Sequence, residues 1–124
     1  MGDLTTNFSA SEFACPCCGR ADMHPDFLAR LQSLRTAWGK PFRPVSGGGF
    51  RCATYNKSPT GAHVEGRAID PNISNADYIP FIKLALEHGF TGIGVKNKSG
   101  RFQLHLDDAT EIAGVRPRPW LWTY

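Results

Sequence analysis

A pair of strand-like runs near the C-terminal end constrains the fold most strongly. The runs cover residues 91–96 and 101–107, and the tetrapeptide Asn-Lys-Ser-Gly that joins them is typical of a hairpin turn. Side chains two residues apart on a strand share a face. Gln103, His105 and Asp107 are therefore expected to point the same way from the second strand.

Two longer segments have the pattern of helices. The first begins at Pro25, which suits the first position of a helix, and ends at Gly39. Its apolar residues recur at spacings of three and four, which gives the helix one apolar face. The second helix begins among residues 74–77 and runs to about His88, where Gly89 stops it.

Shorter elements are expected in the remaining chain. Ser9 and Glu12 fit a capping box, which predicts a short helix at that point. Residues 51–56 have the pattern of a helical turn, and residues 42–46 and 67–71 have that of short strands. Helices and strands do not alternate strictly, so the predicted class is α+β, with a small antiparallel sheet flanked by two main helices and short helical turns.

The composition fits one globular domain over residues 1–124. The chain is 41% hydrophobic and 20% charged, and no apolar run approaches the roughly 18 residues of a membrane span. The net charge of +3 is spread out, without a run of Lys or Arg, so nucleic acid is not expected as a partner. We expect a monomer that does not insert into membranes.

Two separated motifs supply residues that could hold a metal ion. His63 and Asp70 lie seven positions apart, and His105 follows on the predicted hairpin. Catalytic zinc uses such a three-ligand set and leaves its fourth position for water. Spacing alone leaves a second interpretation open, in which His63 is a hydrogen-bonded surface residue and Asp70 caps a strand end.

The four cysteines allow three states. The sequence Cys15-Pro16-Cys17-Cys18-Gly19 resembles half of a metal knuckle, and only Cys52 is left to complete a site. We expect free thiols, with a second structural zinc or a disulfide involving Cys52 as the alternatives.

Several segments resemble, in chain order, the family of zinc D-alanyl-D-alanine carboxypeptidases, which also includes phage L-alanyl-D-glutamate endopeptidases. The matching segments are Phe8-Ser9-Ala10-Ser11-Glu12-Phe13 with the cysteines after it, Ser46-Gly47 with Phe50-Arg51-Cys52 and Asn56, His63 to Asp70 with Gly66-Arg67-Ala68 between them, residues 90–95, residues 102–107 with a His-x-Asp ending, and the tail from Arg118-Pro119-Trp120 to Tyr124.

The resemblance implies a site on the sheet and roles for its residues. It implies Zn²⁺ held by His63, Asp70 and His105. From its forked donors, we expect Arg51 to bind a substrate carboxylate or the oxyanion. A structural salt bridge is the alternative role for Arg51. The remaining residues that we expect in substrate binding are Ser46, Asn56 and Trp120, with Trp122 as a further groove-lining candidate. The alternative for the tail aromatics is packing at an edge of the core.

Two departures from the family pattern affect the expected chemistry. Gly48 and Gly49 are extra residues in the Ser-Gly-aromatic-Arg segment, which we interpret as a flexible loop. Many family members carry an acidic general base three residues before the last zinc His, where this chain has Phe102. We expect Asp107 to act as the base or to orient a ligand His, with Glu65 in reserve.

The predicted function is that of a zinc metallopeptidase that hydrolyses peptide bonds in the stem peptide of bacterial peptidoglycan, as a carboxypeptidase or an endopeptidase. The alternative is a non-catalytic zinc-binding module for cell-wall peptides. No secretory signal opens the sequence. We therefore expect a phage endolysin-like enzyme, made in the cytoplasm and acting on the wall after release, or a component of the virion.

Overall fold

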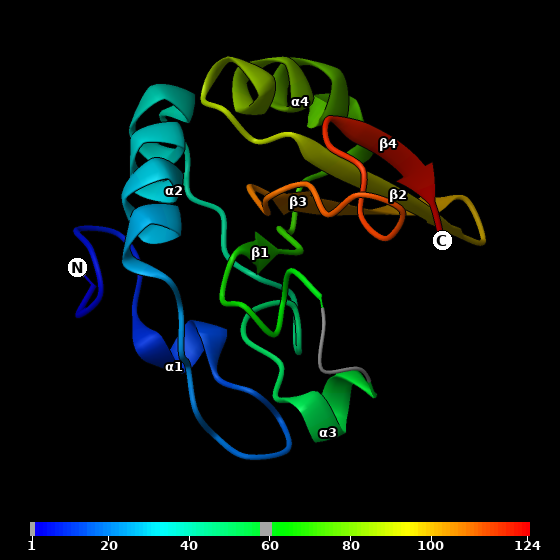
Figure 1. Cartoon of the computed structure of the whole chain (residues 1–124). Coiled ribbons are helices and arrows are strands. Elements are labelled where there is room, and N and C mark those ends of the chain that lie inside the picture. Colours follow the sequence, from blue (N-terminus) through cyan, green and yellow to red (C-terminus); the bar gives the residue numbers. More distant parts are fainter. Residues whose placement is uncertain (1, 58–60) are drawn as a thin grey trace.

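A computed structural model describes residues 2–57 and 61–124 and confirms the α+β class. Figure 1 shows α2 and α4 on one side of a small sheet, with the short helices α1 and α3 below it. The elements, in chain order, are α1 (Ala10–Phe13), α2 (Pro25–Trp38), α3 (Ala53–Asn56), β1 (Ala68–Ile69), the 3-10 turn η1 (Asn75–Asp77), α4 (Tyr78–Glu87), β2 (Gly92–Lys98), β3 (Arg101–Asp107) and β4 (Trp120–Thr123).

The helix ends follow the local sequence. At the start of α1, the backbone N–H of Ser9 donates to the Glu12 carboxylate at 2.9 Å, which confirms the capping box. Pro25 occupies the first turn of α2, and Gly39 ends that helix in the left-handed conformation, with φ +77°. These contacts are made within a few residues, so the sequence was sufficient to predict them.

The sheet is mixed, whereas the sequence predicted an antiparallel one. Its strand order is β1-β3-β2-β4, in which β3 pairs antiparallel with both β1 and β2, while β4 runs parallel to β2. The hairpin fills one edge of β2 and leaves the other edge open. The chain after β3 crosses over through residues 108–119 and adds β4 to that edge, which gives the parallel pair.

The strand expected at residues 42–46 is absent from the described structure. Only an isolated bridge between Pro44 and Pro71 forms there. Proline has no backbone N–H to donate, so this pairing cannot extend into a regular ladder. The segment instead holds residue 70 in place, because the Val45 N–H donates to the Asp70 carbonyl at 2.9 Å.

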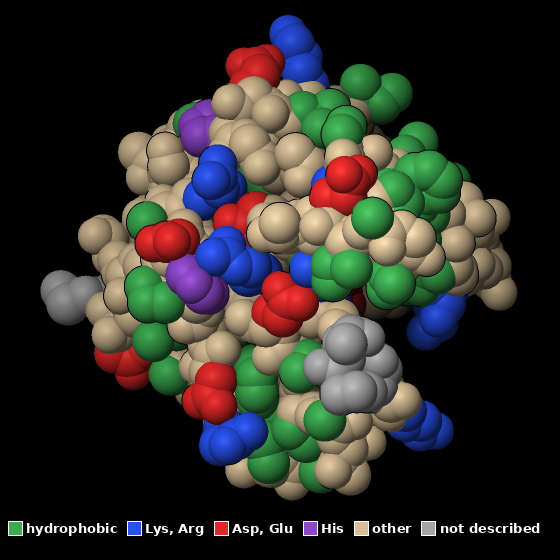
Figure 2. Space-filling model, in the orientation of Figure 1, with side chains coloured by type: hydrophobic (Ala, Val, Ile, Leu, Met, Phe, Trp, Pro, Cys, Tyr) green, Lys and Arg blue, Asp and Glu red, His purple; other side chains and the backbone are tan. Residues whose placement is uncertain are grey.

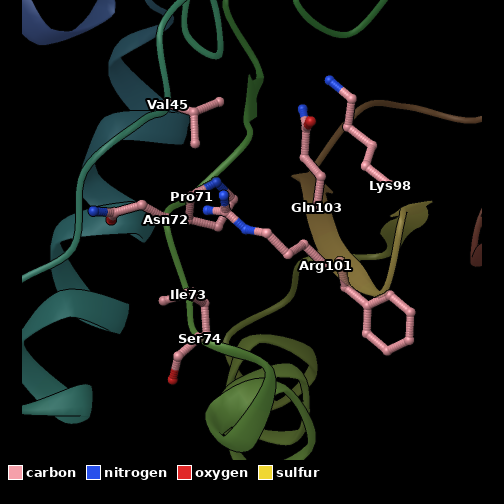
Figure 3. A pocket seen from close by; sticks show the side chains of 9 residues that line it. Val45, Pro71, Asn72, Ile73, Ser74, Lys98, Arg101 and Gln103 are labelled. Carbon is pink, nitrogen blue, oxygen red and sulfur yellow. The ribbon is translucent and has the colours of Figure 1, made fainter.

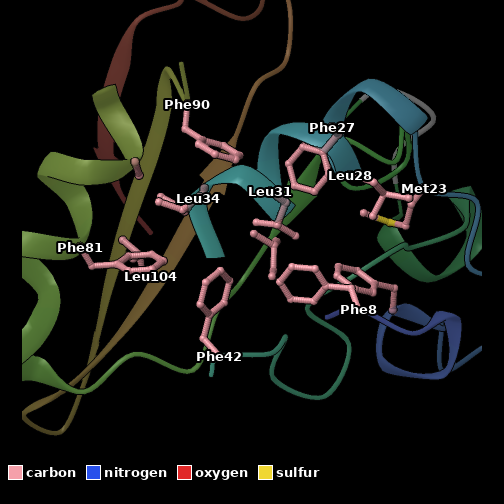
Figure 4. Packing of buried hydrophobic residues seen from close by; sticks show 14 of the residues in the cluster. Phe8, Met23, Phe27, Leu28, Leu31, Leu34, Phe42, Phe81, Phe90 and Leu104 are labelled. Carbon is pink, nitrogen blue, oxygen red and sulfur yellow. The ribbon is translucent and has the colours of Figure 1, made fainter. Parts of the chain in front are cut away.

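The hydrophobic core lies between one face of the sheet and the two long helices. Figure 4 shows Leu31 and Leu34 of α2 among Phe42, Phe81 and Leu104. On β3, Leu104 and Leu106 face this core, so the residues between and after them face the opposite side. The fold thereby directs His105 and Asp107 away from the core and toward the site described below.

Charged side chains of both signs are spread over the face shown in Figure 2. Acidic and basic side chains alternate across that face, and neither sign dominates it. Among the described helices, none is both long and apolar enough to cross a membrane.

Candidate metal centre

Three buried side chains from separate segments converge next to β3. They are His63 from a turn before β1, Asp70 directly after β1, and His105 in the middle of β3. Asp70 is 1% exposed, and each histidine is 7% exposed. The structure therefore brings together the ligand set that the sequence predicted, and it removes the interpretation of His63 as a surface residue.

The spacing of the three ligand atoms fits a small divalent cation. His63 Nε2 and His105 Nδ1 lie 3.3 and 3.2 Å from Asp70 Oδ1, and the two nitrogens are 3.2 Å apart. A tetrahedral zinc ion with bonds of about 2.0–2.1 Å to nitrogen and oxygen requires ligand atoms about 3.3–3.4 Å apart. The triangle is close to one face of that tetrahedron.

Hydrogen bonds fix which nitrogen of each imidazole is available to a metal. His63 Nδ1 lies 2.8 Å from the Gly49 carbonyl oxygen, which can only accept, so Nδ1 carries the proton and Nε2 keeps its lone pair. His105 Nε2 lies 2.7 Å from a carboxylate oxygen of Asp107, which leaves His105 Nδ1, 3.2 Å from Asp70 Oδ1, as the nitrogen available to a metal ion. Both lone pairs are thus directed toward Asp70.

Asp107 lies behind His105, away from the other two ligands. Its Oδ2 accepts from His105 Nε2 and, at 2.7 Å, from Arg118 Nη2, while its Oδ1 accepts from Arg118 Nε at 2.9 Å. Burial raises the pKa of Asp107, but the hydrogen bonds from His105 and Arg118 outweigh it and hold the pKa at about 2. Of the two roles that the sequence left open for Asp107, this geometry favours orienting the ligand histidine over acting as the base.

Arg51 forms the alternative contact that the sequence allowed, a salt bridge, and it also faces the site. Its Nη2 lies 2.8 Å from Asp70 Oδ2, and its Nε donates to the Gly47 carbonyl at 2.7 Å. Burial raises the pKa of Asp70, but hydrogen bonds and charges from His105 and His63 outweigh it, so the pKa lies well below its ordinary value. Asp70 is therefore an anion in the site, as a metal ligand must be.

The ligands line a cavity of about 230 Å³ together with Arg51, Trp122 and Tyr124. The ring of Trp122 packs on His105, with centroids 5.1 Å apart. Of the other residues proposed for substrate binding, Ser46, Asn56 and Trp120 are not among the described residues that line this cavity.

The strand register explains why Trp122 rather than Trp120 reaches the cavity. Gly94 pairs with His105 on one side and with Trp122 on the other, whereas Trp120 pairs with Gly92, opposite Asp107. Trp120 therefore lies two residues along the strand from His105 and is 50% exposed. The register of β4 depends on the crossover. The two-residue spacing of Trp120, Trp122 and Tyr124 predicts only a shared face, and it does not show which of them lies beside His105.

Two glycines of β2 leave room for this arrangement. A Cβ atom at Gly94 would lie 2.9 Å from the Trp122 ring, and one at Gly92 would overlap the Asp107 carboxylate. Larger residues at these positions would displace the aromatic wall or the partner of His105.

The loop containing Gly48 and Gly49 is not the flexible segment that the sequence predicted. Both glycines are buried, and the Asp70 N–H donates to the Gly48 carbonyl at 2.8 Å. The Gly49 carbonyl orients His63, as described above. The two extra residues thus hold two of the three ligands through their backbone.

Glu65, the reserve candidate for the base, forms an ion pair outside the cavity. Arg116 Nη1 lies 2.7 Å from Glu65 Oε2. Among the described residues that line the cavity, Asp70 is the only acid.

A larger pocket of about 610 Å³ lies beside the metal centre (Figure 3). Val45 and the segment 71–74 line one side, and Lys98, Arg101 and Gln103 of the hairpin line the other. Gln103 Nε2 lies 3.5 Å from Asp70 Oδ2, so this residue joins the pocket to the metal centre.

A buried His-Asp-His set beside an arginine, next to the small sheet of an α+β fold, is the kind of ligand set that metal-dependent hydrolases use. A family model described as Peptidase M15 matches residues 6–107, which is most of the chain. The chain belongs to the peptidase M15 family, and this confirms the resemblance to zinc carboxypeptidases and endopeptidases of the D-alanyl-D-alanine type. Comparisons with curated proteins and with solved structures gave no match.

Proposed function

We propose that the protein hydrolyses a peptide bond in the stem peptide of bacterial peptidoglycan, with Zn²⁺ held by His63, Asp70 and His105. The observation that carries this proposal is the triangle of ligand atoms, with edges of 3.2–3.3 Å, that opens into a cavity beside Arg51. When bound, Zn²⁺ polarises a carbonyl and lowers the pKa of water, which is the chemistry that peptide hydrolysis needs.

Arg51 supplies the positive charge for the reaction. The contacts to Asp70 and Gly47 hold its guanidinium at the cavity wall. In that position the guanidinium stabilises the negative charge that develops on the scissile carbonyl oxygen, or it binds a substrate carboxylate.

Asp107 and Arg118 form a support for His105. The carboxylate fixes the tautomer and the ring direction of the imidazole, and Arg118 holds the carboxylate. Such partners behind a ligand maintain metal affinity, so Asp107 is proposed as a positioning residue.

The pocket beside the site fits the chemistry of a stem peptide. Peptidoglycan stem peptides carry free carboxylates, and Lys98 and Arg101 place two positive charges on the pocket wall. A peptide whose scissile bond lies at the metal centre would extend past Gln103 into this pocket.

A non-catalytic zinc-binding module is the second candidate, and one observation favours it. The position of the usual acidic base is Phe102, which is 44% exposed, and the only acid lining the described cavity is the ligand Asp70. A fold can keep its metal and its binding site while losing the chemistry.

One experiment tests both candidates. The purified protein is incubated with peptidoglycan, with and without a chelator, and new peptide termini are identified by mass spectrometry. We expect chelator-sensitive cleavage, and the new termini distinguish release of a terminal D-alanine from internal cleavage. Retention on the wall without any new terminus would instead support the module.

A further inference from the structure

Three of the four cysteines gather at a second place, between α1 and α3. Cys15 and Cys18 follow α1, and Cys52 caps the start of α3. Their sulfur atoms all lie within 4.8 Å of one another, and no His, Asp or Glu of the described chain joins them. Cys17 is exposed and lies outside this cluster.

The backbone around Cys15 is shaped to hold a negatively charged sulfur. The Gly19 N–H donates to the Cys15 carbonyl at 2.8 Å, which closes a tight turn over Cys15-Pro16-Cys17-Cys18. The Cys52 N–H donates to Cys15 Sγ at 3.4 Å, so a backbone donor points directly at this sulfur. Such a donor stabilises the thiolate, which is the form of cysteine that binds a metal ion.

The sulfur spacing matches a shared metal ion. Cys15 Sγ and Cys52 Sγ are 3.7 Å apart. Two thiolates bound tetrahedrally to zinc at about 2.3 Å lie about 3.8 Å apart, whereas the sulfurs of a disulfide lie about 2.05 Å apart. The Cys15-x-x-Cys18 spacing is also that of zinc-binding loops.

A nearby cation balances the charge of three thiolates. Arg20 lies near Cys18, which raises the pKa of its guanidinium, and it also pairs with Asp22 at 3.4 Å. Its guanidinium carbon lies 5.6 Å from the centroid of the Phe50 ring. Three thiolates with one divalent cation carry a net negative charge, which a neighbouring guanidinium stabilises.

We propose that Cys15, Cys18 and Cys52 bind a second Zn²⁺ ion, separate from the His-Asp-His centre, with solvent in the fourth position. Cys52 directly follows Arg51 in the chain, so this ion ties the segment after α1 to the loop that positions Arg51. The proposal rests on the cysteine geometry alone and does not depend on peptidase activity.

The test counts metal ions in protein prepared under reducing conditions with zinc. We expect two zinc ions per chain in the unmodified protein and one in Cys52→Ser. Cys17→Ser is the matched control, because it removes a neighbouring thiol outside the cluster, and it should keep both ions. His63→Ala should lose only the ion of the other centre.

A second measurement uses the unmodified protein, so it does not depend on whether a variant folds. A thiol reagent should titrate one cysteine, Cys17, in the zinc-loaded protein and four after chelation. Cobalt in place of zinc should give thiolate charge-transfer absorption in the unmodified protein and in His63→Ala.

Three results would each overturn the assignment: a single zinc in the unmodified protein that is lost in His63→Ala, four reactive thiols whether or not zinc is present, or loss of an ion in Cys17→Ser. A protein with two zinc ions and no hydrolysis would leave this site standing and would remove only the proposed peptidase activity.

Discussion

Replacement of Asp107 by Asn separates the two roles that an acid beside the metal centre can have. In the structure the Asp107 carboxylate accepts from His105 Nε2 at 2.7 Å and from two nitrogens of Arg118 at 2.7 and 2.9 Å. Asn keeps the shape of the side chain but loses the negative charge, and its amide group presents a donor where Arg118 requires an acceptor.

The expected loss is therefore one of metal affinity. Removing the partner of a metal-bound histidine weakens metal binding or activity by about 10–100-fold, which corresponds to about 1.4–2.7 kcal/mol. We expect the zinc affinity of Asp107→Asn to fall in this range, measured by competition with a chelating indicator. At saturating zinc, hydrolysis of a stem peptide should return to within about tenfold of the unmodified rate.

A matched control exists in the adjacent residue. Asp108 is also an acid in ion pairs, with Arg67 at 3.1 Å and Arg30 at 3.2 Å, but it does not contact His105. Asp108→Asn should leave the zinc affinity unchanged. If Asp107→Asn kept its zinc affinity and lost about 10²–10⁴-fold in rate at saturating zinc, Asp107 would be the general base and the positioning role would be wrong.

Three further outcomes follow from the same geometry. His63→Ala removes one of three ligands and should abolish tight zinc binding at the His-Asp-His centre, which cobalt spectra can follow separately from thiolate-bound metal. Arg51→Lys cannot contact both Asp70 and the Gly47 carbonyl as the guanidinium does. The value of kcat/KM should therefore fall about 10²–10³-fold while the zinc content is unchanged. Full activity would refute the role of Arg51 in charge stabilisation. Gly94→Ala places a Cβ 2.9 Å from the Trp122 ring. It should lower the free energy of unfolding, measured by urea titration, by about 1–3 kcal/mol. An unchanged free energy of unfolding would show that β4 shifts to accommodate the methyl group.

Local features of the sequence determined the helices and the hairpin. The capping box at Ser9, the start of α2 at Pro25 and its end at Gly39 each depend on residues within one or two turns. The alternation along residues 101–107 placed His105 and Asp107 on one face in the same way.

The metal-binding residues could also be predicted from the sequence. The spacing from His63 to Asp70 and the later His105 identified the ligand set, once they were combined with the other family-like segments. Residue types and spacings carry this information because the chemistry of metal ligands restricts which side chains can serve.

The direction of each contact was decided only by the tertiary structure. Asp107, the last residue of β3, pairs with Arg118 near the end of the crossover. The parallel pairing of β4 brings Trp122 rather than Trp120 beside His105. The Gly49 carbonyl selects the tautomer of His63, although glycine has no side chain that a sequence pattern could show. Each of these contacts joins separate segments of the chain. Their geometry is fixed when the sheet edge and the loops pack together, which no local preference determines.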